Sequence, residues 1–261
     1  MPTPQDPQTA VERLTDLDLL RIEMGVLWGL DAQHRVGGPV ELAVGVAPAG
    51  IIAAVGQRIS DDVTNRVLEL VADGVPPRPG AIPSFVDSCR ELLTAEGPGE
   101  LVLSGGPSYH VAPPVHFAGQ VSVLRSDSAH ADQLLNRRPD NWEPDEWIEL
   151  IGGGTGAPWA MVLDRDRVVS ICHTPARTAA AAEAGTWTAP EFRKRGYAAA
   201  TTAAWADLLS PYCPHLFYST SADNHSSQHV AGRLELRPIG WTWKLTAPKL
   251  TRTETQPTPT V

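Results

Sequence analysis

The residues best suited to chemistry lie together between Glu183 and Ala198. This segment reads as a strand, then Pro190, then the basic run 193–195 with Gly196 directly after it, and finally an alanine-rich helix. The first N–H groups of a helix lack backbone partners and carry partial positive charge, so they attract anions. Gly196 allows positive φ and close approach of a ligand to the backbone. The pattern predicts a site for a phosphate-like anion, with a solvated basic turn as the alternative interpretation.

A second polar segment follows the next predicted strand. Asn224 stands just before a predicted helix, and Ser227 follows three residues later. Asparagine is a preferred N-cap residue, so a purely structural role would explain it. Its side chain could equally contact a ligand at the same helix start, and the two roles can coexist.

Taken in order, these motifs resemble the GNAT superfamily of acetyl-CoA-dependent N-acetyltransferases. The run Arg193-x-x-Gly196-x-Ala198 after a strand is similar to the acyl-CoA pyrophosphate motif of that family. The longer pattern that begins at Glu183 is similar to a two-domain bacterial branch of it. The helix opening at Asn224 and the segment 239–241 resemble the motifs that follow in the family. The resemblance covers roughly residues 116–246 and implies acetyl-CoA (CoA) as the cofactor.

The resemblance also implies which residues hold that cofactor. The backbone of three strand residues would pair with the pantetheine arm: Trp187, Thr188 and Ala189. The basic turn and helix start would hold the pyrophosphate: Arg193, Lys194, Arg195, Gly196, Tyr197 and Ala198. Asn224 and Ser227 would contact the pantetheine near its sulfur.

Catalytic roles follow from the same comparison. Glu183 is the expected base that deprotonates an acceptor amine, with an edge-exposed glutamate or a buried ion-pair partner as the alternative interpretation. Many family members carry a tyrosine acid seven residues after the asparagine, where this chain has Ala231. Tyr218 or Ser227 could substitute for it. Loss of the tyrosine need not prevent turnover, because a thiolate (thiol pKa about 8.5) is a fairly good leaving group.

The expected function is therefore transfer of an acetyl group from acetyl-CoA to a primary amine, by direct attack in a ternary complex. A small-molecule amine is the first choice of acceptor, and a protein or peptide amine is the second. A non-catalytic acyl-CoA-binding sensor or partner-binding protein is the alternative, favoured by Ala231. A homodimer is left open.

Composition limits the other partners. Acidic residues number 30 and basic residues 21, which gives a formal charge of −9. General nucleic-acid binding needs a basic footprint, so a nucleic-acid partner is not expected. The 42% apolar and 20% charged residues are ordinary globular values that exclude wholesale disorder. The longest apolar run, 43–56, is too short and too broken by Pro48 and glycines to span a bilayer.

Cysteine and histidine spacing gives no metal or disulfide signal. The chain has three cysteines without CxxC spacing: Cys89, Cys172 and Cys213. That spacing argues against a disulfide framework and a cysteine-built zinc site. His225 and His229 would share a helix face, but no four-ligand set accompanies them. No signal peptide is expected, because the N-terminus lacks a basic start and an apolar stretch. The cysteine pattern fits a reducing compartment, so a cytoplasmic protein is expected.

The chain is predicted to divide near the proline-rich stretch 112–114. We expect an N-terminal α/β domain over residues 1–112, a GNAT domain over 113–250 and a disordered tail over 251–261. The N-terminal domain could be a degenerate relative of the GNAT fold. Strands are expected at 41–46, 51–55, 101–103, 117–124, 158–163, 168–172, 181–189, 216–221 and 240–245, with a loop at 104–108. Helices are expected at 11–27, 61–73, 129–136, 145–151, 198–209 and 226–236 and from Ser84. This order predicts an α/β (α+β) fold with a mixed, mostly antiparallel sheet flanked by helices.

Overall fold

The computed structural model describes residues 14–96 and 99–248, in which nine strands form one continuous sheet. The strands are β1 (Val40–Ala47), β2 (Gly50–Val55), β3 (Val102–Val111), β4 (Leu124–Arg125), β5 (Gly156–Asp164), β6 (Arg167–Arg177), β7 (Ala181–Thr188), β8 (His215–Ser219) and β9 (Arg237–Thr246). Their order is β2-β1-β9-β3-β8-β7-β6-β5-β4. Neighbouring strands are antiparallel except β7 and β8, which are parallel.

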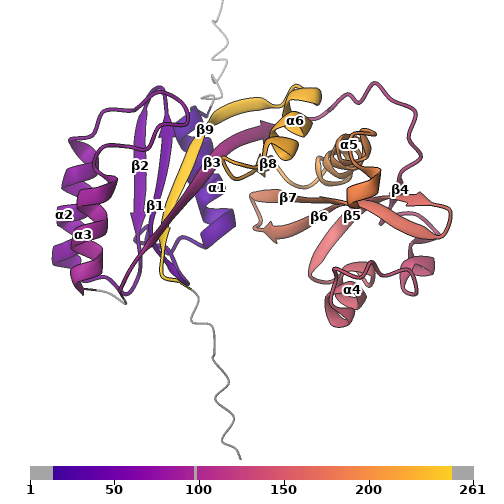
Figure 1. Ribbon diagram of the computed structural model, residues 1–261, viewed down its shortest axis with the longest axis horizontal. Helices are drawn as coiled ribbons and strands as arrows, with labels where there is room; N and C mark the ends of the chain where they lie inside the picture. The colour runs from indigo at the N-terminus through magenta and orange to yellow at the C-terminus, as the bar shows by residue number, and fades with distance from the viewer. Residues whose placement is uncertain (1–13, 97–98, 249–261) are drawn as a thin grey trace, which may run out of the picture.

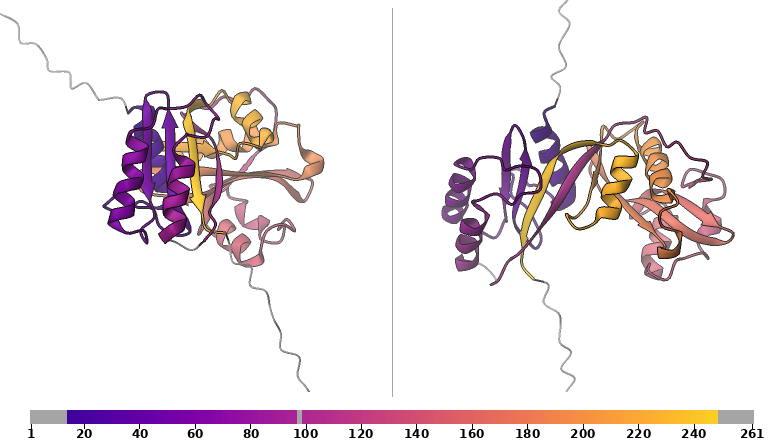
Figure 2. Two further views of the ribbon diagram at one scale, coloured as in Figure 1. Left: turned by 60° about the vertical axis from the view of Figure 1, so that its left-hand side comes forward. Right: turned by 45° about the horizontal axis from the view of Figure 1, so that its top comes forward.

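Helices cover both faces of this sheet (Figure 1). They are α1 (Asp16–Trp28), α2 (Asp61–Ala72), α3 (Val86–Glu96), α4 (Pro144–Ile151), α5 (Tyr197–Leu209) and α6 (His225–Arg233), with short 3-10 turns η1 (Ala131–Leu134) and η2 (Pro190–Phe192). The core clusters place α1 and α4 on one face. They place α2, α3, α5 and α6 on the other. Figure 2 shows the sheet between these layers from two further sides.

The two halves of the chain share the sheet rather than each forming its own. β9, from the end of the described chain, lies between β1 and β3 of the first half (Figure 1). β3 also pairs with β8 of the second half. The boundary near residue 112 therefore stays a prediction about sequence organisation, and the hydrogen-bonded sheet runs across it.

Most of the predicted elements are confirmed within a few residues, including the β5–β6 hairpin and α5. Two were predicted too long: the strand 117–124 is only β4, and the helix 129–136 is only η1. Of the first of these segments, only its end reaches the β5 edge, so the rest has no strand to pair with. Residues 11–13 of the first predicted helix lie outside the described residues, and so does the predicted tail 251–261.

The loop predicted at 104–108 was wrong, because these residues form the middle of β3. Gly105 and Gly106 lie there since neighbouring backbone passes very close to them. A Cβ on Gly106 would overlap the carbonyl oxygen of Thr220, and one on Gly105 would overlap that of Thr242. The two glycines are therefore strand positions at which a neighbouring backbone segment comes too close for a side chain.

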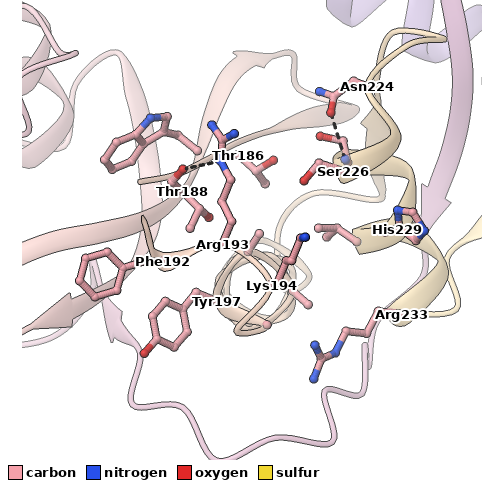
Figure 3. Close-up of a pocket in the computed structure, with 16 residues that line it drawn as sticks. Thr186, Thr188, Phe192, Arg193, Lys194, Tyr197, Asn224, Ser226, His229 and Arg233 are labelled. Atoms are coloured by element: carbon pink, nitrogen blue, oxygen red, sulfur yellow. Dashed lines mark hydrogen bonds between the residues drawn. The ribbon is translucent and has the colours of Figure 1, made fainter. Parts of the chain in front are cut away.

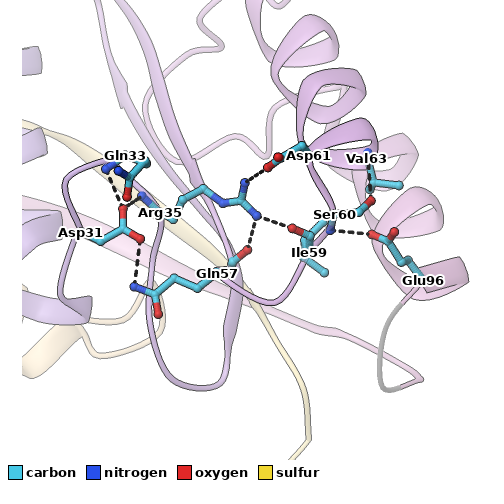
Figure 4. Close-up of polar contacts among 10 residues, drawn as sticks. Asp31, Gln33, Arg35, Gln57, Ile59, Ser60, Asp61, Val63 and Glu96 are labelled. Atoms are coloured by element: carbon cyan, nitrogen blue, oxygen red, sulfur yellow. Dashed lines mark hydrogen bonds and ion pairs between the residues drawn. The ribbon is translucent and has the colours of Figure 1, made fainter.

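Local side-chain contacts fix the helix starts of the first half. Thr15 and Asp18 form a capping box at the start of α1. Arg35 donates to the carbonyls of Gly56, at 2.9 Å, and Ile59, and its guanidinium pairs with Asp61 at 3.2 Å (Figure 4). This guanidinium therefore contacts the loop between β2 and the start of α2 at three points, and the contacts of Gln57 with Asp31 and of Ser60 with Glu96 add to it.

The close approach at Gly106 gives a test of the shared sheet. Gly106→Ala is expected to destabilise the protein by roughly 2 kcal/mol or more, because the new methyl group meets backbone that cannot move aside. Gly232→Ala is the control: nothing lies within 4 Å of its Cβ position, so it should change stability by about 1 kcal/mol at most, in the stabilising direction. Urea unfolding of both variants measures the difference, and equal stabilities would contradict the placement of β3.

Candidate active site

The site begins where the one parallel pair of the sheet ends. β7 and β8 are paired from Ala181–His215 to Glu183–Phe217 and no further. On its other side, β7 remains paired with β6 as far as Thr188. The backbone of residues 184–188 therefore has one hydrogen-bonding edge that β8 does not use. An extended ligand could add to that edge as a strand would.

A groove of about 630 Å³ follows this edge and the start of α5 (Figure 3). Its walls come from β7, the turn after it, and the facing side of α6. The lining residues are Thr186, Trp187, Thr188, Phe192, Arg193, Lys194, Gly196, Tyr197, Ala198, Ala199, Asn224, Ser226, Ser227, His229, Val230 and Arg233. Most residues predicted to hold the cofactor are thus brought together around one cavity.

The start of α5 is built differently from those of α1 and α2. Its N-cap is Gly196, with φ 84° and no side-chain cap, and its first turn has no acidic residue. By contrast, α1 and α2 begin with side-chain caps and carry acidic residues in the first turn. Lys194 also has positive φ, at 64°. The free N–H groups of α5 therefore face the groove, and none of the described residues that line it is acidic.

Arg233, which the sequence analysis did not single out, contributes a further cation. Its guanidinium lies beside Gly196, where it would be 2.9 to 3.1 Å from a Cβ. It also lies over the Phe117 ring at 5.2 Å. The only signal available in the sequence was a basic residue in the last turn of the helix after Asn224.

Two predicted cofactor residues do not line the groove. Ala189 is fully buried and its N–H donates to Val169. The Arg195 guanidinium lies 4.8 Å from the Phe192 ring centroid and donates to the Glu191 carbonyl. These two residues shape the turn rather than face the cavity.

Asn224, Ser227 and Tyr218 lie at the other side of the groove. The Asn224 side-chain oxygen accepts from the Ser227 N–H at 3.1 Å, so Asn224 is the N-cap of α6. Tyr218 lies behind the lining, with its hydroxyl 3.4 Å from the Thr186 hydroxyl. Burial raises the pKa of Tyr218, and a hydrogen bond from Ser227 partly opposes that rise. Position 231, where a tyrosine was looked for, is an alanine buried in the core beside α5.

Glu183 lies on the opposite face of the sheet from Tyr218, beneath α1. Only 4% of it is exposed. Its Oε1 accepts from both the N–H and the hydroxyl of Ser219, each at 2.7 Å. Burial raises the pKa of Glu183 to about 7, against which the Ser219 hydrogen bonds act. The carboxylate is therefore held at the point where β7 and β8 part, with a proton affinity suited to neutral pH.

His173 lies next to this point on the same face. A Cβ on Gly185 would be 2.5 Å from its Nε2, so the imidazole lies across the β7 backbone. Its ring packs edge-on against Trp142 at 5.0 Å, and burial lowers the pKa of His173 to about 4. It is thus a neutral, aromatic neighbour of the Glu183 region at pH 7.

Comparison with known proteins indicates the family. Residues 114–237 match the family profile of the acetyltransferase (GNAT) domain. These residues are similar to a GNAT acetyltransferase domain, and the match supports membership of the GNAT superfamily and an N-acetyltransferase as the enzyme class. No curated protein sequence matches it.

Solved acetyltransferase structures are similar to about half of the chain or more at low identity, as three examples show. A GNAT-family protein of Novosphingobium aromaticivorans is 17% identical, with 90% of this chain and 100% of that one covered, at a TM-score of 0.47. A GNAT-family acetyltransferase of Colwellia psychrerythraea is 10% identical, with 91% and 98% covered, at 0.45. An aminoglycoside N-acetyltransferase in complex with CoA is 16% identical, with 48% and 90% covered, at 0.34.

Membrane-spanning helices and metal-binding clusters are both absent from the described residues. None of their helices is long and apolar enough to cross a membrane. They also contain no group of three or more histidine, cysteine, aspartate or glutamate side chains arranged to hold a metal ion.

The burial of Glu183 predicts a pH-dependent stability. Its folded-state pKa of about 7 lies above the ordinary 4.5, so its contribution to stability is present below pH 4.5 and is lost as pH rises through about 7. The loss amounts to roughly 3 kcal/mol. Glu183→Gln should lack this contribution, read as the difference from the wild type in urea unfolding between pH 4.5 and 8.

The control for this prediction is Glu191→Gln, at an exposed glutamate whose pKa is lowered by local hydrogen bonds. That variant should keep the wild-type fall in stability over the same range. A Glu183→Gln curve parallel to that of the wild type would contradict the burial described here.

Proposed function

We propose that the protein transfers an acetyl group from acetyl-CoA to the primary amine of a small molecule. The observation that carries the proposal is the uncapped, acid-free start of α5, which opens into a groove with Arg193, Lys194 and Arg233 around it. Such a helix start suits a pyrophosphate. Gly196 and its neighbours leave room there that a side chain would fill.

The residues that would hold the cofactor fall into two groups. Lys194, Arg193, Arg233 and the N–H groups of α5 would bind its phosphates. The free edge of β7, with Asn224 and Ser227 opposite, would bind the pantetheine arm. When bound, acetyl-CoA supplies a thioester whose carbonyl carbon is open to attack by an amine. Holding that carbonyl beside the acceptor accounts for much of the rate.

Glu183 is the proposed base. An alkylamine has a pKa of about 10.4, so only about one molecule in a thousand is neutral at pH 7, a cost of roughly 4 kcal/mol. A carboxylate with a pKa near 7 can take up that proton and then release it near neutral pH. Because Glu183 faces α1 and the groove lies on the α5 side, we propose that the acceptor approaches from the α1 side.

Tyr218 is the proposed acid. Its raised pKa means that it keeps its proton at neutral pH, as a proton donor must. Its hydroxyl lies between Thr186 and Ser227, two lining residues at the inner end of the groove. It could therefore protonate a departing thiolate, a role for which Ala231 has no suitable group. The three buried free cysteines are compatible with a reducing compartment, and we propose the cytoplasm.

A non-catalytic acyl-CoA-binding protein is the second candidate. Ala231 and the deep burial of Glu183 favour it, because both limit proton transfer. A protein or peptide amine as acceptor is a further alternative within the catalytic proposal. Binding and turnover must therefore be measured separately.

The cofactor site is tested by isothermal titration with acetyl-CoA and with CoA. Gly196→Asp should weaken both by about ten-fold or more, roughly 1.4 kcal/mol, because its carboxylate takes the anion position beside Arg233. Gly196→Asn is the matched control, since it has the same shape and tolerance of positive φ without the charge. Equal losses in the two variants would mean that backbone strain, not charge, is responsible. Absence of binding to the wild type at millimolar ligand would contradict the proposed function.

The base is tested by steady-state kinetics with an amine found by screening. Glu183→Gln keeps the Ser219 hydrogen bonds to Oε1 but cannot accept a proton. We expect kcat/KM to fall by about 10²–10⁴-fold while acetyl-CoA affinity stays unchanged. Unchanged turnover would reject Glu183 as the base. Binding without turnover of any small amine or peptide in the wild type would favour the non-catalytic candidate.

A further inference from the structure

A layer of polar side chains is buried between α1 and the sheet, directly around Glu183. Glu23 on α1 and Ser108 on β3 are completely buried, and Glu183 on β7 is 4% exposed. Ser108 is paired with Ser219 across β3 and β8, so its side chain is on the Glu183 face. The first half of the chain thus contributes two of the four polar residues of this layer.

Most of the polar atoms in the layer have no partner. Both carboxylate oxygens of Glu23, the Oε2 of Glu183 and the hydroxyl of Ser108 are buried without a hydrogen bond. Glu183 Oε1 accepts the two hydrogen bonds from Ser219, and Ser108 lies close enough to Glu23 to lower its pKa against the effect of burial. Buried polar groups are normally satisfied, so these atoms require an explanation.

No cation among the described residues neutralises the two carboxyl groups. The charged groups on α1 and on the strands around the layer pair with others: Asp16 with Arg237, Asp18 with Arg21, Glu41 with Arg58, and Lys244 with the face of the Trp28 ring. The histidines on β3, β6 and β8 have pKa values lowered by burial: His110, His173 and His215. On the opposite sheet face, Cys172 and Tyr218 have raised pKa values, to which the Glu183 charge adds.

Two carboxyl groups buried together without a cation cannot both be ionised at low cost. Burial raises the pKa of Glu23 far above its ordinary value, and the neighbouring Glu183 charge raises it further. The cheapest arrangement at neutral pH leaves one negative charge and one proton in the layer.

We propose that Glu23 and Glu183 hold one proton between them at neutral pH, and that Glu23 is a positioning residue for the acid–base chemistry of Glu183. The catalytic part of this inference rests on the proposed function. When the acceptor ammonium gives up its proton, the singly charged pair becomes neutral with two protons, and it returns to one by releasing a proton to solvent. The first half of the chain thereby takes part in the chemistry of the second.

The proton count is measured on the apo protein. Unfolding at pH 8 in weak buffer releases protons, and a pH-sensitive dye measures their number. Each variant is compared with the wild type, so that the protons exchanged by histidines and cysteines cancel in the difference. The variants are Glu23→Gln, Glu183→Gln and the double variant. Glu41→Gln is the matched control, since Glu41 is also buried in the first half but is paired with Arg58.

A shared proton predicts non-additive losses. Each single variant should release about one proton fewer than the wild type, and the double variant should also release only about one fewer. The control should release as many as the wild type. A full proton retained in Glu183→Gln would place it on Glu23 alone, and no loss in Glu23→Gln would place it on Glu183 alone. Either result would overturn the proposal.

Two further measurements make the outcome decisive. If a variant does not fold, carbon-13 NMR of the glutamate carboxyl groups in the wild type replaces it: two buried resonances must titrate together, and independent titration overturns sharing. With an active amine, Glu23→Gln should shift the acidic limb of kcat/KM while acetyl-CoA affinity stays unchanged. An unmoved limb would reject the positioning role, whereas a shared proton without any turnover would reject only the proposed function.

Discussion

The site depends on one feature of the sheet, the parallel pairing of β7 and β8 that stops at Glu183–Phe217. If this pairing had continued to the ends of both strands, the edge of β7 would have been covered. Because the strands part, β8 leaves the backbone edge of residues 184–188 unpaired at the mouth of a groove, where the Arg193 side chain donates to the Thr188 carbonyl at 3.3 Å. The same parting gives Ser219 the position from which it donates to Glu183.

The sheet then separates the chemistry into two sides. The α5 side has the helix start, the cations and the groove, all of which suit a large anion. The α1 side has acids and neutral histidines, which suit a group that arrives with a positive charge. The single layer of the sheet backbone separates these two environments. A site for an anion and a site for a cation can therefore lie on opposite faces beside the gap between β7 and β8.

The first half of the chain is part of this arrangement. β9 is inserted between β1 and β3, and α1 closes the face on which Glu183 lies. Removing the first half would expose the Glu183 carboxylate, leave β9 without both of its partner strands and leave β8 paired with β7 alone. The burial that raises the pKa of Glu183 is therefore supplied by residues far away in sequence.

The sequence by itself determined the local elements and the anion motif, because these depend on short-range patterns. The basic turn, Gly196 and the alanine-rich helix are contiguous, so their joint placement needed no tertiary information. The family resemblance pointed to Glu183 for the same reason. Tertiary structure alone decided the remainder. Arg233 reaches Gly196 from another helix, and Glu23 of the first half is buried in the same layer as Glu183. The glycines of β3 lie within a strand because of the backbone beside them. Such contacts join residues with no periodic relation in sequence, and their energies exist only once the chain has folded.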